Sequence, residues 1–562
     1  MPRMEQEDGP GDAVREGRLD VIIVGAGFSG LYMLHRLRQQ GLIVSVLEAA
    51  PEVGGTWYWN AYPGARCDVE SMDYSYSFSP ELDQEWEWTE KYASQPEILG
   101  YLQHVAMRFD LRKDIRFNTR VTAAVFDDEA CRWQLTAEGG ERFAAQFCIF
   151  ATGGLSAPLA PPFPGLDRFE GQWYTTQQWP HEPVDFKAKR VAIIGTGSSS
   201  VQSGPIIAEE AERLTVFQRT PSFSVPGRNG PLPPEEQAER KADYPRVREI
   251  VRASALGMHL NVSEKSALEL APEERQAEME MRWTLGGTPR FMMSFADLLV
   301  NAASNDIAAD FLRDKIREVV DDPQVAELLC PEYPVGTKRL CTDNGYFEMF
   351  NRDNVSLVSV RDNPIAEITP KGLRLEDGSE YEADVIVFAV GYDAMTGTLL
   401  RIDVRGRGGR SLRDEWRDGA QTYLGLGVAG FPNLFTITGP ASPSLLTVMV
   451  VSIEQHVEWI TECIGYVREH GFDAIEPTED GQDQWMDHHI EVGNATLFPR
   501  ANSYYLGANV PGKPRVLTVY LGGLGVYRER CSEIAANGYE GFTLSGGQDR
   551  SAAGSRPAPA TT

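Results

Sequence analysis

The chain has 562 residues, of which 42% are apolar and 24% are charged. At roughly 150 residues per domain, this length predicts three to four domain-sized units with ample apolar residues for their cores, and it excludes fibrous and largely disordered proteins. The 81 acidic residues outnumber the 53 basic ones and give a net charge of −28. Such a surface repels nucleic acids and anionic membranes, so we expect neither as a partner.

The seven cysteines are scattered along the chain and include no Cys-x-x-Cys pair. This pattern argues against a disulfide framework, a structural zinc site and a dithiol reductase, so we expect reduced thiols, no metal and a cytoplasmic protein. The polar N-terminus lacks the apolar segment of a signal peptide. We expect disorder over residues 1–17 and 546–562, which are small, polar and proline-bearing.

The first structured segment combines a strand, a glycine turn and a helix. A β-branched run over residues 20–24 leads into Gly25 and Gly27, and a helical pattern follows from Gly30. The next strand, over residues 42–47, ends at Glu48, where a carboxylate can accept both ribose hydroxyls and repel a 2′-phosphate. The pattern therefore predicts a dinucleotide fold for FAD or NAD, with the pyrophosphate at the helix N-terminus.

The same pattern recurs 170 residues later, with Gly195 and Gly197 in the turn and Ser200 in place of the third glycine. A side chain there should push the helix slightly away from the strand. The following strand, over residues 214–219, ends at Arg219 and Thr220 rather than at an acid, and a guanidinium suits a 2′-phosphate. We therefore expect FAD in the first fold and NADPH in the second.

Two further stretches need an interpretation. Residues 423–453 carry no charge and are long enough to span a bilayer, but three prolines break any single helix, so we expect a buried strand, a turn and a helix start. His488 and His489 could suggest a metal pair, but adjacent residues on a helix point apart, so we expect a solvated surface pair.

These patterns predict an α/β protein with two Rossmann-like dinucleotide-binding domains and a helical insertion. The NADP domain interrupts the FAD domain, and residues rich in Glu, Arg, Ala, Leu and Met at helical spacing interrupt the NADP domain in turn. The expected ranges are 18–155 and 385–545 for FAD, 156–228 and 328–384 for NADP, and 229–327 for the insertion.

Several longer motifs resemble the type I Baeyer–Villiger monooxygenases, and the resemblance is closest to phenylacetone and steroid monooxygenases. It covers about residues 18–545. The segments that carry it are GGTWYWNAYPGARCD at 54–68, FEGQWYTTQQWP at 169–180, GTKR at 336–339, SIEQHVEW at 452–459 and GANVPGK at 507–513. The second segment departs from the family fingerprint, because Thr175 stands where the family has histidine.

The resemblance implies an enzyme that uses FAD, NADPH and O2 to convert a small-molecule ketone into an ester or lactone through a C4a-peroxyflavin. It further implies that Arg339 supplies a fixed positive charge that cannot donate a proton, that Asp68 holds Arg339 in place, and that Lys338 joins Arg219 and Thr220 at the 2′-phosphate. We expect a monomer that contacts neither nucleic acid nor membrane.

The motifs and the resemblance together imply three sets of binding residues. The FAD set is Gly25, Gly27, Ser29, Gly30, Glu48, Gly55, Thr56, Trp57, Asp68, Tyr74, Val121 and Met449. The NADP set is Arg66, Gly195, Thr196, Gly197, Ser198, Ser199, Gln202, Arg219, Thr220, Lys338, Arg339 and Tyr504, the last on a mobile loop. The substrate pocket is expected at Ser442, Leu445 and Leu446.

Two alternatives remain open at this point. An N- or S-oxygenating flavin monooxygenase shares both nucleotide folds, although the 54–68 motif and Arg339 argue against it. A degenerate flavoprotein that binds NADPH and mainly makes peroxide is the third reading, and Thr175 is its only support.

Overall fold

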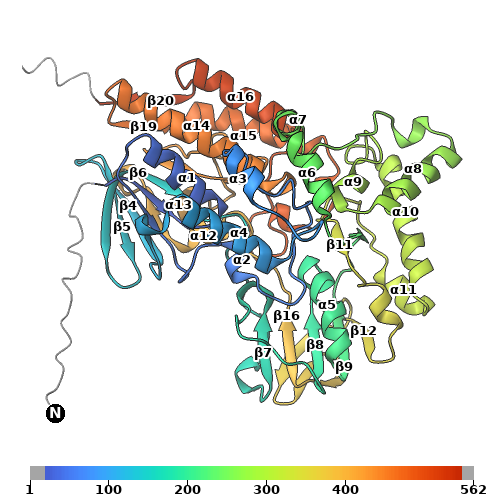
Figure 1. The fold of residues 1–562 in the computed structure, drawn as a ribbon. Coiled ribbons are helices and arrows are strands. Elements are labelled where there is room, and N and C mark those ends of the chain that lie inside the picture. The colour runs from blue at the N-terminus through green and yellow to red at the C-terminus, as the bar shows by residue number, and fades with distance from the viewer. Residues whose placement is uncertain (1–18, 547–562) are drawn as a thin grey trace, which may run out of the picture.

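The computed structural model describes residues 19–546 (Figure 1). The ends that we expected to be disordered lie outside the described residues, apart from Gly546.

The first sheet is built on a parallel core in the order β18–β6–β1–β2–β3. From β6 it extends through the antiparallel strands β5 and β4, and β17 then pairs with β4 in parallel. Strands β1, β2 and β18 and the C-terminal half of β6 are mainly apolar and buried, as expected of strands covered on both faces. The strands are β1 (Leu19–Val24), β2 (Val44–Leu47), β3 (Ile115–Arg116), β4 (Val121–Asp127), β5 (Arg132–Ala137), β6 (Arg142–Phe150), β17 (Asp403–Arg405) and β18 (Leu434–Thr436).

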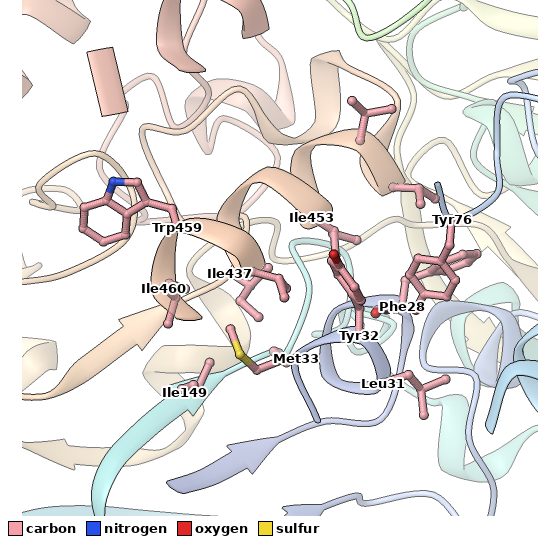
Figure 2. Close-up of a cluster of buried hydrophobic side chains, with 14 of the residues drawn as sticks. Phe28, Leu31, Tyr32, Met33, Tyr76, Ile149, Ile437, Ile453, Trp459 and Ile460 are labelled. Carbon is pink, nitrogen blue, oxygen red and sulfur yellow. Dashed lines mark hydrogen bonds between the residues drawn. The ribbon is translucent and has the colours of Figure 1, made fainter. Parts of the chain in front are cut away.

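Two helices from opposite ends of the chain form the core above this sheet. Helix α1 (Phe28–Gln39) packs against α14 (Met449–Glu469), and Figure 2 shows Tyr32 and Met33 facing Ile453 and Ile460. Burying each large apolar side chain contributes about 1.5–3 kcal/mol. The C-terminal segment therefore packs against the first fold.

The second sheet is fully parallel, in the order β12–β9–β8–β16–β7. Its strands are β7 (Gln172–Thr175), β8 (Arg190–Ile194), β9 (Arg213–Gln218), β12 (Val355–Ser359) and β16 (Val385–Phe388), with α5 (Ser198–Glu210) after β8. The expected boundary at residue 385 is wrong, because β16 pairs with β8 and β7. The chain leaves this sheet only after Phe388.

The insertion consists of helices, as predicted, and reaches across to the first fold. Helix α7 packs against α16 (Leu524–Ala536) of the first fold, and the two helices lie side by side in Figure 1. Its helices are α6 (Pro234–Ala242), α7 (Tyr244–Ala253), α8 (Pro272–Leu285), α9 (Thr288–Met292), α10 (Ala302–Val319) and α11 (Pro323–Leu329). Its ends are joined by the parallel pair β10 (Ser224–Pro226) and β11 (Cys341–Asp343).

Further helices and strands complete the fold. The helices are α2 (Thr56–Trp59), α3 (Pro80–Glu85), α4 (Gln95–Arg108), α12 (Gly397–Arg401), α13 (Leu412–Glu415), α15 (Glu479–Asn494) and α16 (Leu524–Ala536). The remaining strands are β13 (Ile365–Thr369), β14 (Gly372–Leu375) and β15 (Glu380–Glu382) in one sheet, and β19 (Ala474–Pro477) with β20 (Phe542–Ser545).

The charge-free stretch forms β18, a short 3₁₀ turn at Ser444–Leu446 and the start of α14, as expected. No helix within residues 19–546 combines the length and apolar character needed to cross a membrane.

Candidate active site

The first glycine turn brings backbones together where side chains would not fit. Gly25 has φ +107°, and a Cβ on it would lie 2.6 Å from the carbonyl oxygen of Ala151. A Cβ on Gly30 would lie 1.8 Å from the carbonyl oxygen of Gly25. Gly27 and Gly55 face each other, since a Cβ on Gly55 would lie 3.0 Å from the Gly27 Cα. This bare backbone at the start of α1 fits the pyrophosphate of FAD.

Glu48 lies at the end of β2, where the sequence placed it. Its carboxylate accepts hydrogen bonds from the backbone N–H groups of Ala26 (2.6 Å) and Ala50 (2.7 Å). Burial raises the pKa of the Glu48 carboxyl, and the two N–H donors act in the opposite direction. Val121, also in the predicted FAD set, packs near this end of the strands in a cluster with Val24 and Leu47.

Asp68 and Arg339 form a bidentate ion pair although 271 residues separate them. Arg339 Nε donates to Asp68 Oδ2 (2.8 Å), and Nη2 donates to Oδ1 (2.7 Å). Its third nitrogen, Nη1, donates to the carbonyl oxygen of Leu445 (3.2 Å). The Asp68 charge, acting against burial, holds the pKa of Arg339 well above its ordinary value. The side chain is 32% exposed, so a fixed positive charge remains accessible.

Predicted flavin and substrate residues gather around this pair. Leu445, Leu446, Met449 and Tyr504 belong to one apolar cluster. The indole N–H of Trp57 on α2 donates to the Tyr74 hydroxyl (3.3 Å). Ser442 differs, because it is fully buried and its hydroxyl donates to the carbonyl oxygen of Gly439 (2.7 Å). Its side chain is thus engaged with the backbone.

The second glycine turn repeats the geometry of the first. Gly195 has φ +110°, and a Cβ on it would lie 2.4 Å from the carbonyl oxygen of Ala389. A Cβ on Gly197 would meet no heavy atom within 4 Å, so there is open space at the start of α5. The Thr196 hydroxyl donates to the carbonyl oxygen of Thr220 (2.7 Å), which joins the turn to the end of β9. The open backbone fits a second pyrophosphate.

Three basic residues meet at the end of β9. Burial lowers the pKa of Lys338, and the charges of Arg219 and Arg361 lower it further. The ammonium of Lys338 lies 4.6 Å from the Tyr333 ring centroid. Concentrated positive charge in a chain of net charge −28 fits the 2′-phosphate of NADPH.

Arg361 is absent from the predicted set. The signal was available, because the strand now seen as β12 is followed by Val360 and Arg361. Ser359 pairs with Gln218 in the parallel sheet, so Arg361 and Arg219 follow neighbouring strands at the same edge of the sheet. Tyr505 is a second residue that the sequence did not single out, and its hydroxyl interacts with Arg339.

The two nucleotide folds meet at Gln202 on α5. Its amide donates to the carbonyl oxygen of Arg66 (3.1 Å) and accepts from the Tyr62 hydroxyl (2.8 Å). The Arg66 guanidinium binds Glu90 (2.7 Å), so that part of the predicted NADP set is held within the first fold. Of the neighbouring serines in that set, Ser198 lies with its hydroxyl 3.4 Å from the Cys341 sulfur, and Ser199 accepts at its backbone oxygen from Ser203.

The expectation of a solvated histidine pair is correct for His488, which is exposed, and wrong for His489. His489 is fully buried against α15's neighbours and bonds to the carbonyl oxygen of Leu517 (2.9 Å), whereas His488 contacts the Tyr520 hydroxyl (2.9 Å). Among the described residues, no group of three or more His, Cys, Asp or Glu side chains could hold a metal ion.

Comparison with known proteins identifies the family to which the chain belongs. Residues 18–228 match the family model described as flavin-binding monooxygenase-like. The chain is 42% identical over 529 residues to acetone monooxygenase (methyl acetate-forming) of Gordonia sp. (strain TY-5), which covers 94% of this chain and 99% of that one. It is also 42% identical over 527 residues to phenazine N-monooxygenase PhzNO1 of Lysobacter antibioticus, covering 93% and 96% of the two chains.

A solved structure, oxidized steroid monooxygenase bound to NADP, matches with a TM-score of 0.90 and 52% identity over 94% of this chain and 100% of that one. These similarities confirm the resemblance and the fold expected from the sequence, with an FAD and an NADP domain. The chain belongs to the Baeyer–Villiger family of flavin-dependent, NADPH-using monooxygenases.

Proposed function

We propose that the enzyme converts a neutral ketone, O2, NADPH and a proton into an ester or lactone, NADP⁺ and water. The bidentate Asp68–Arg339 pair is the observation that carries this proposal, because it holds a permanent cation at an accessible apolar site. Arginine stays protonated throughout the physiological pH range, so it can stabilise negative charge without donating a proton to it.

The bound FAD, once reduced, supplies the activation of O2. Arg339 faces the negative charge that develops at the reacting oxygen and at the ketone carbonyl, and Asp68 fixes the orientation of the guanidinium. Leu445, Leu446 and Met449 give this region an apolar lining, which strengthens the electrostatic effect of Arg339. Tyr504 lies in the same cluster and would cover bound NADP⁺.

The second nucleotide fold delivers NADPH. The turn at Gly195 and Gly197 receives the pyrophosphate, and Arg219 and Lys338 bind the 2′-phosphate together with Thr220. Lys338 and Arg339 are adjacent, so with NADPH bound one short segment would hold the 2′-phosphate with one side chain and serve the reacting centre with the next.

A panel of cyclic, linear and aromatic ketones tests the proposal. The purified yellow protein is incubated with NADPH and each ketone, ester is quantified by mass spectrometry, and peroxide is measured in parallel. At least one ketone should give ester in proportion to the NADPH consumed. Peroxide equal to NADPH with every ketone would overturn the proposal in favour of the degenerate flavoprotein.

Oxygenation of an aromatic nitrogen is the second candidate, favoured by the 42% identity to phenazine N-monooxygenase. Phenazine and an aryl sulfide therefore belong in the same panel. Oxidation of either compound while all ketones are refused would replace the first proposal with this one.

We also propose that the enzyme works as a monomer in the cytoplasm. Its seven cysteines are all free thiols, which suits a reducing compartment, and one chain supplies both nucleotide folds. Light scattering of the purified holoenzyme measures the oligomeric state.

A further inference from the structure

Glu70 is a carboxylate held by three cations two residues after Asp68. Its oxygens pair with Arg240 (2.8 Å), with Arg290 and with Lys91 (3.5 Å), and its side chain is only 13% exposed. Burial acts to raise the pKa of Glu70, but the charges of Arg290 and Arg240 lower it below its ordinary value. Glu70 is therefore an ionised group within an ion cluster.

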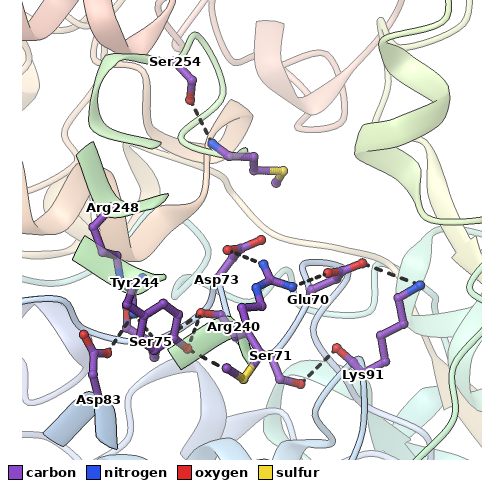
Figure 3. Close-up of polar contacts among 12 residues, drawn as sticks. Glu70, Ser71, Asp73, Ser75, Asp83, Lys91, Arg240, Tyr244, Arg248 and Ser254 are labelled. Atoms are coloured by element: carbon purple, nitrogen blue, oxygen red, sulfur yellow. Dashed lines mark hydrogen bonds and ion pairs between the residues drawn. The ribbon is translucent and has the colours of Figure 1, made fainter. Parts of the chain in front are cut away.

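Two of these cations come from the helical insertion. Arg240 lies on α6 and Arg290 on α9, and Arg240 also pairs with Asp73 (2.6 Å). A second contact is made by α7, whose Arg248 pairs with Asp83 (2.9 Å). Figure 3 shows Arg240 between Glu70 and Asp73, and Arg248 beside Asp83. Arginines of the insertion thus form ion pairs with the carboxylates of this segment.

The backbone around Asp68 connects these ion pairs to the position of Asp68. The N–H of Cys67 donates to the carbonyl oxygen of Ala93 (3.1 Å), and that of Ser71 donates to Lys91 (2.8 Å). Between these two anchors, Asp68 reaches Arg339 while Glu70 reaches the insertion. Both carboxylates line one cavity of about 530 Å³, which also borders Arg240 and Arg290.

We propose that Glu70 is a positioning residue: its ion cluster with Arg240 and Arg290 fixes the Asp68 segment against the insertion, and thereby sets the orientation of Arg339. This inference rests on the proposed function, because it assigns Glu70 a part in the placement of the proposed catalytic cation. Glu70 itself does not contact that cation.

The test replaces Glu70 with glutamine, which keeps the shape and removes the charge. The variant should oxidise NADPH within about twofold of the wild-type rate with an unchanged KM for NADPH. The ratio of ester to NADPH should fall by about 5- to 100-fold, since a displaced catalytic group costs up to about 10²-fold. Each NADPH that is oxidised without forming ester should instead reduce one O2 to H2O2, which receives both electrons.

Glu367→Gln is the matched control. Glu367 also lies between two arginines, Arg168 (2.9 Å) and Arg374, but on β13 in the three-stranded sheet. Its ester ratio should stay at the wild-type value. If Glu70→Gln does not fold, Arg290→Gln breaks the same cluster while leaving Arg240 paired with Asp73, and the same loss of coupling is expected.

A double variant separates positioning from a general loss of structure. In an Arg339→Lys background the orientation of the guanidinium is already lost, so adding Glu70→Gln should change the ester ratio by less than about twofold. Three results would each overturn this inference without affecting the proposed function. They are a wild-type ester ratio in Glu70→Gln, an equal loss in Glu367→Gln, and full additivity in the double variant. Absence of ester from the wild-type enzyme would overturn the proposed function and the inference with it.

Discussion

At the scale of single residues, the two nucleotide sites are distinguished by what ends the second strand of each fold. Glu48 follows β2 and accepts hydrogen bonds from buried backbone N–H groups. Arg219 follows β9, and its positive charge lowers the pKa of Lys338. A carboxylate repels a 2′-phosphate and a guanidinium binds it, so one exchange of charge separates FAD from NADPH in otherwise similar folds.

Arg219→Ala should therefore weaken the binding of NADPH and leave the binding of NADH largely unchanged. Loss of a charge-assisted bond of about 1.5–3 kcal/mol corresponds to an increase of about 10- to 100-fold in the KM for NADPH. Initial rates with both cofactors measure it. Arg213→Ala, at the exposed opposite end of β9, is the control and should change neither KM. An equal rise for NADPH and NADH would contradict the assignment of Arg219 to the phosphate.

At the scale of elements, the two strand–turn–helix units differ at the third position of the glycine motif. Gly30 leaves no space for a Cβ against the carbonyl of Gly25, whereas the fully buried Ser200 is accommodated in the second unit. This difference is the basis for the prediction that α5 lies further from its strand than α1 does.

Gly30→Ser should destabilise the protein by about 1–3 kcal/mol and reduce the FAD that copurifies, because the helix must shift to relieve the overlap. Ser200→Gly, the reverse change in the second fold, should leave the FAD content unchanged. Absorbance at the flavin band and the melting temperature report both effects. Full flavin occupancy in Gly30→Ser would show that the close contact is not required.

Helix α14 carries a buried carboxyl that links stability to pH. Glu454 accepts from the Ser77 N–H (2.6 Å) and hydroxyl (2.5 Å), and burial raises its pKa from 4.5 to about 7 despite these bonds. The folded state thus retains a proton that the unfolded chain releases. The stability from the protonated group is complete below about pH 4.5 and is lost as the pH rises to about 7.

Glu454→Gln removes this titration. Its free energy of unfolding relative to wild type should rise by about 1–3 kcal/mol between pH 5 and pH 8, measured by urea denaturation. Glu458→Gln, one turn along α14 at a side chain that is 28% exposed, is the control and should show a smaller change. A difference for Glu454→Gln that is constant with pH would contradict a buried proton on this carboxyl.

At the scale of the whole molecule, the sequence predicted those features that are encoded by neighbouring residues or by long motifs. Strands, glycine turns and helical spacing identify the two folds because each unit is encoded within about 30 residues. The boundary at residue 385 was wrong because β16 is an apolar run whose sheet partner is not written in its own sequence. Glu70 was missed because a carboxylate among polar residues resembles a solvated surface until the insertion is placed against it.

The most direct test of the account is the amount of ester formed per NADPH by Arg339→Ala, measured with a ketone that the wild-type enzyme accepts. The variant should retain FAD and oxidise NADPH but yield less than about 1% of the wild-type ester ratio, because removal of the fixed cation costs about 10²- to 10³-fold. An ester ratio equal to that of the wild-type enzyme would contradict the central role of Arg339.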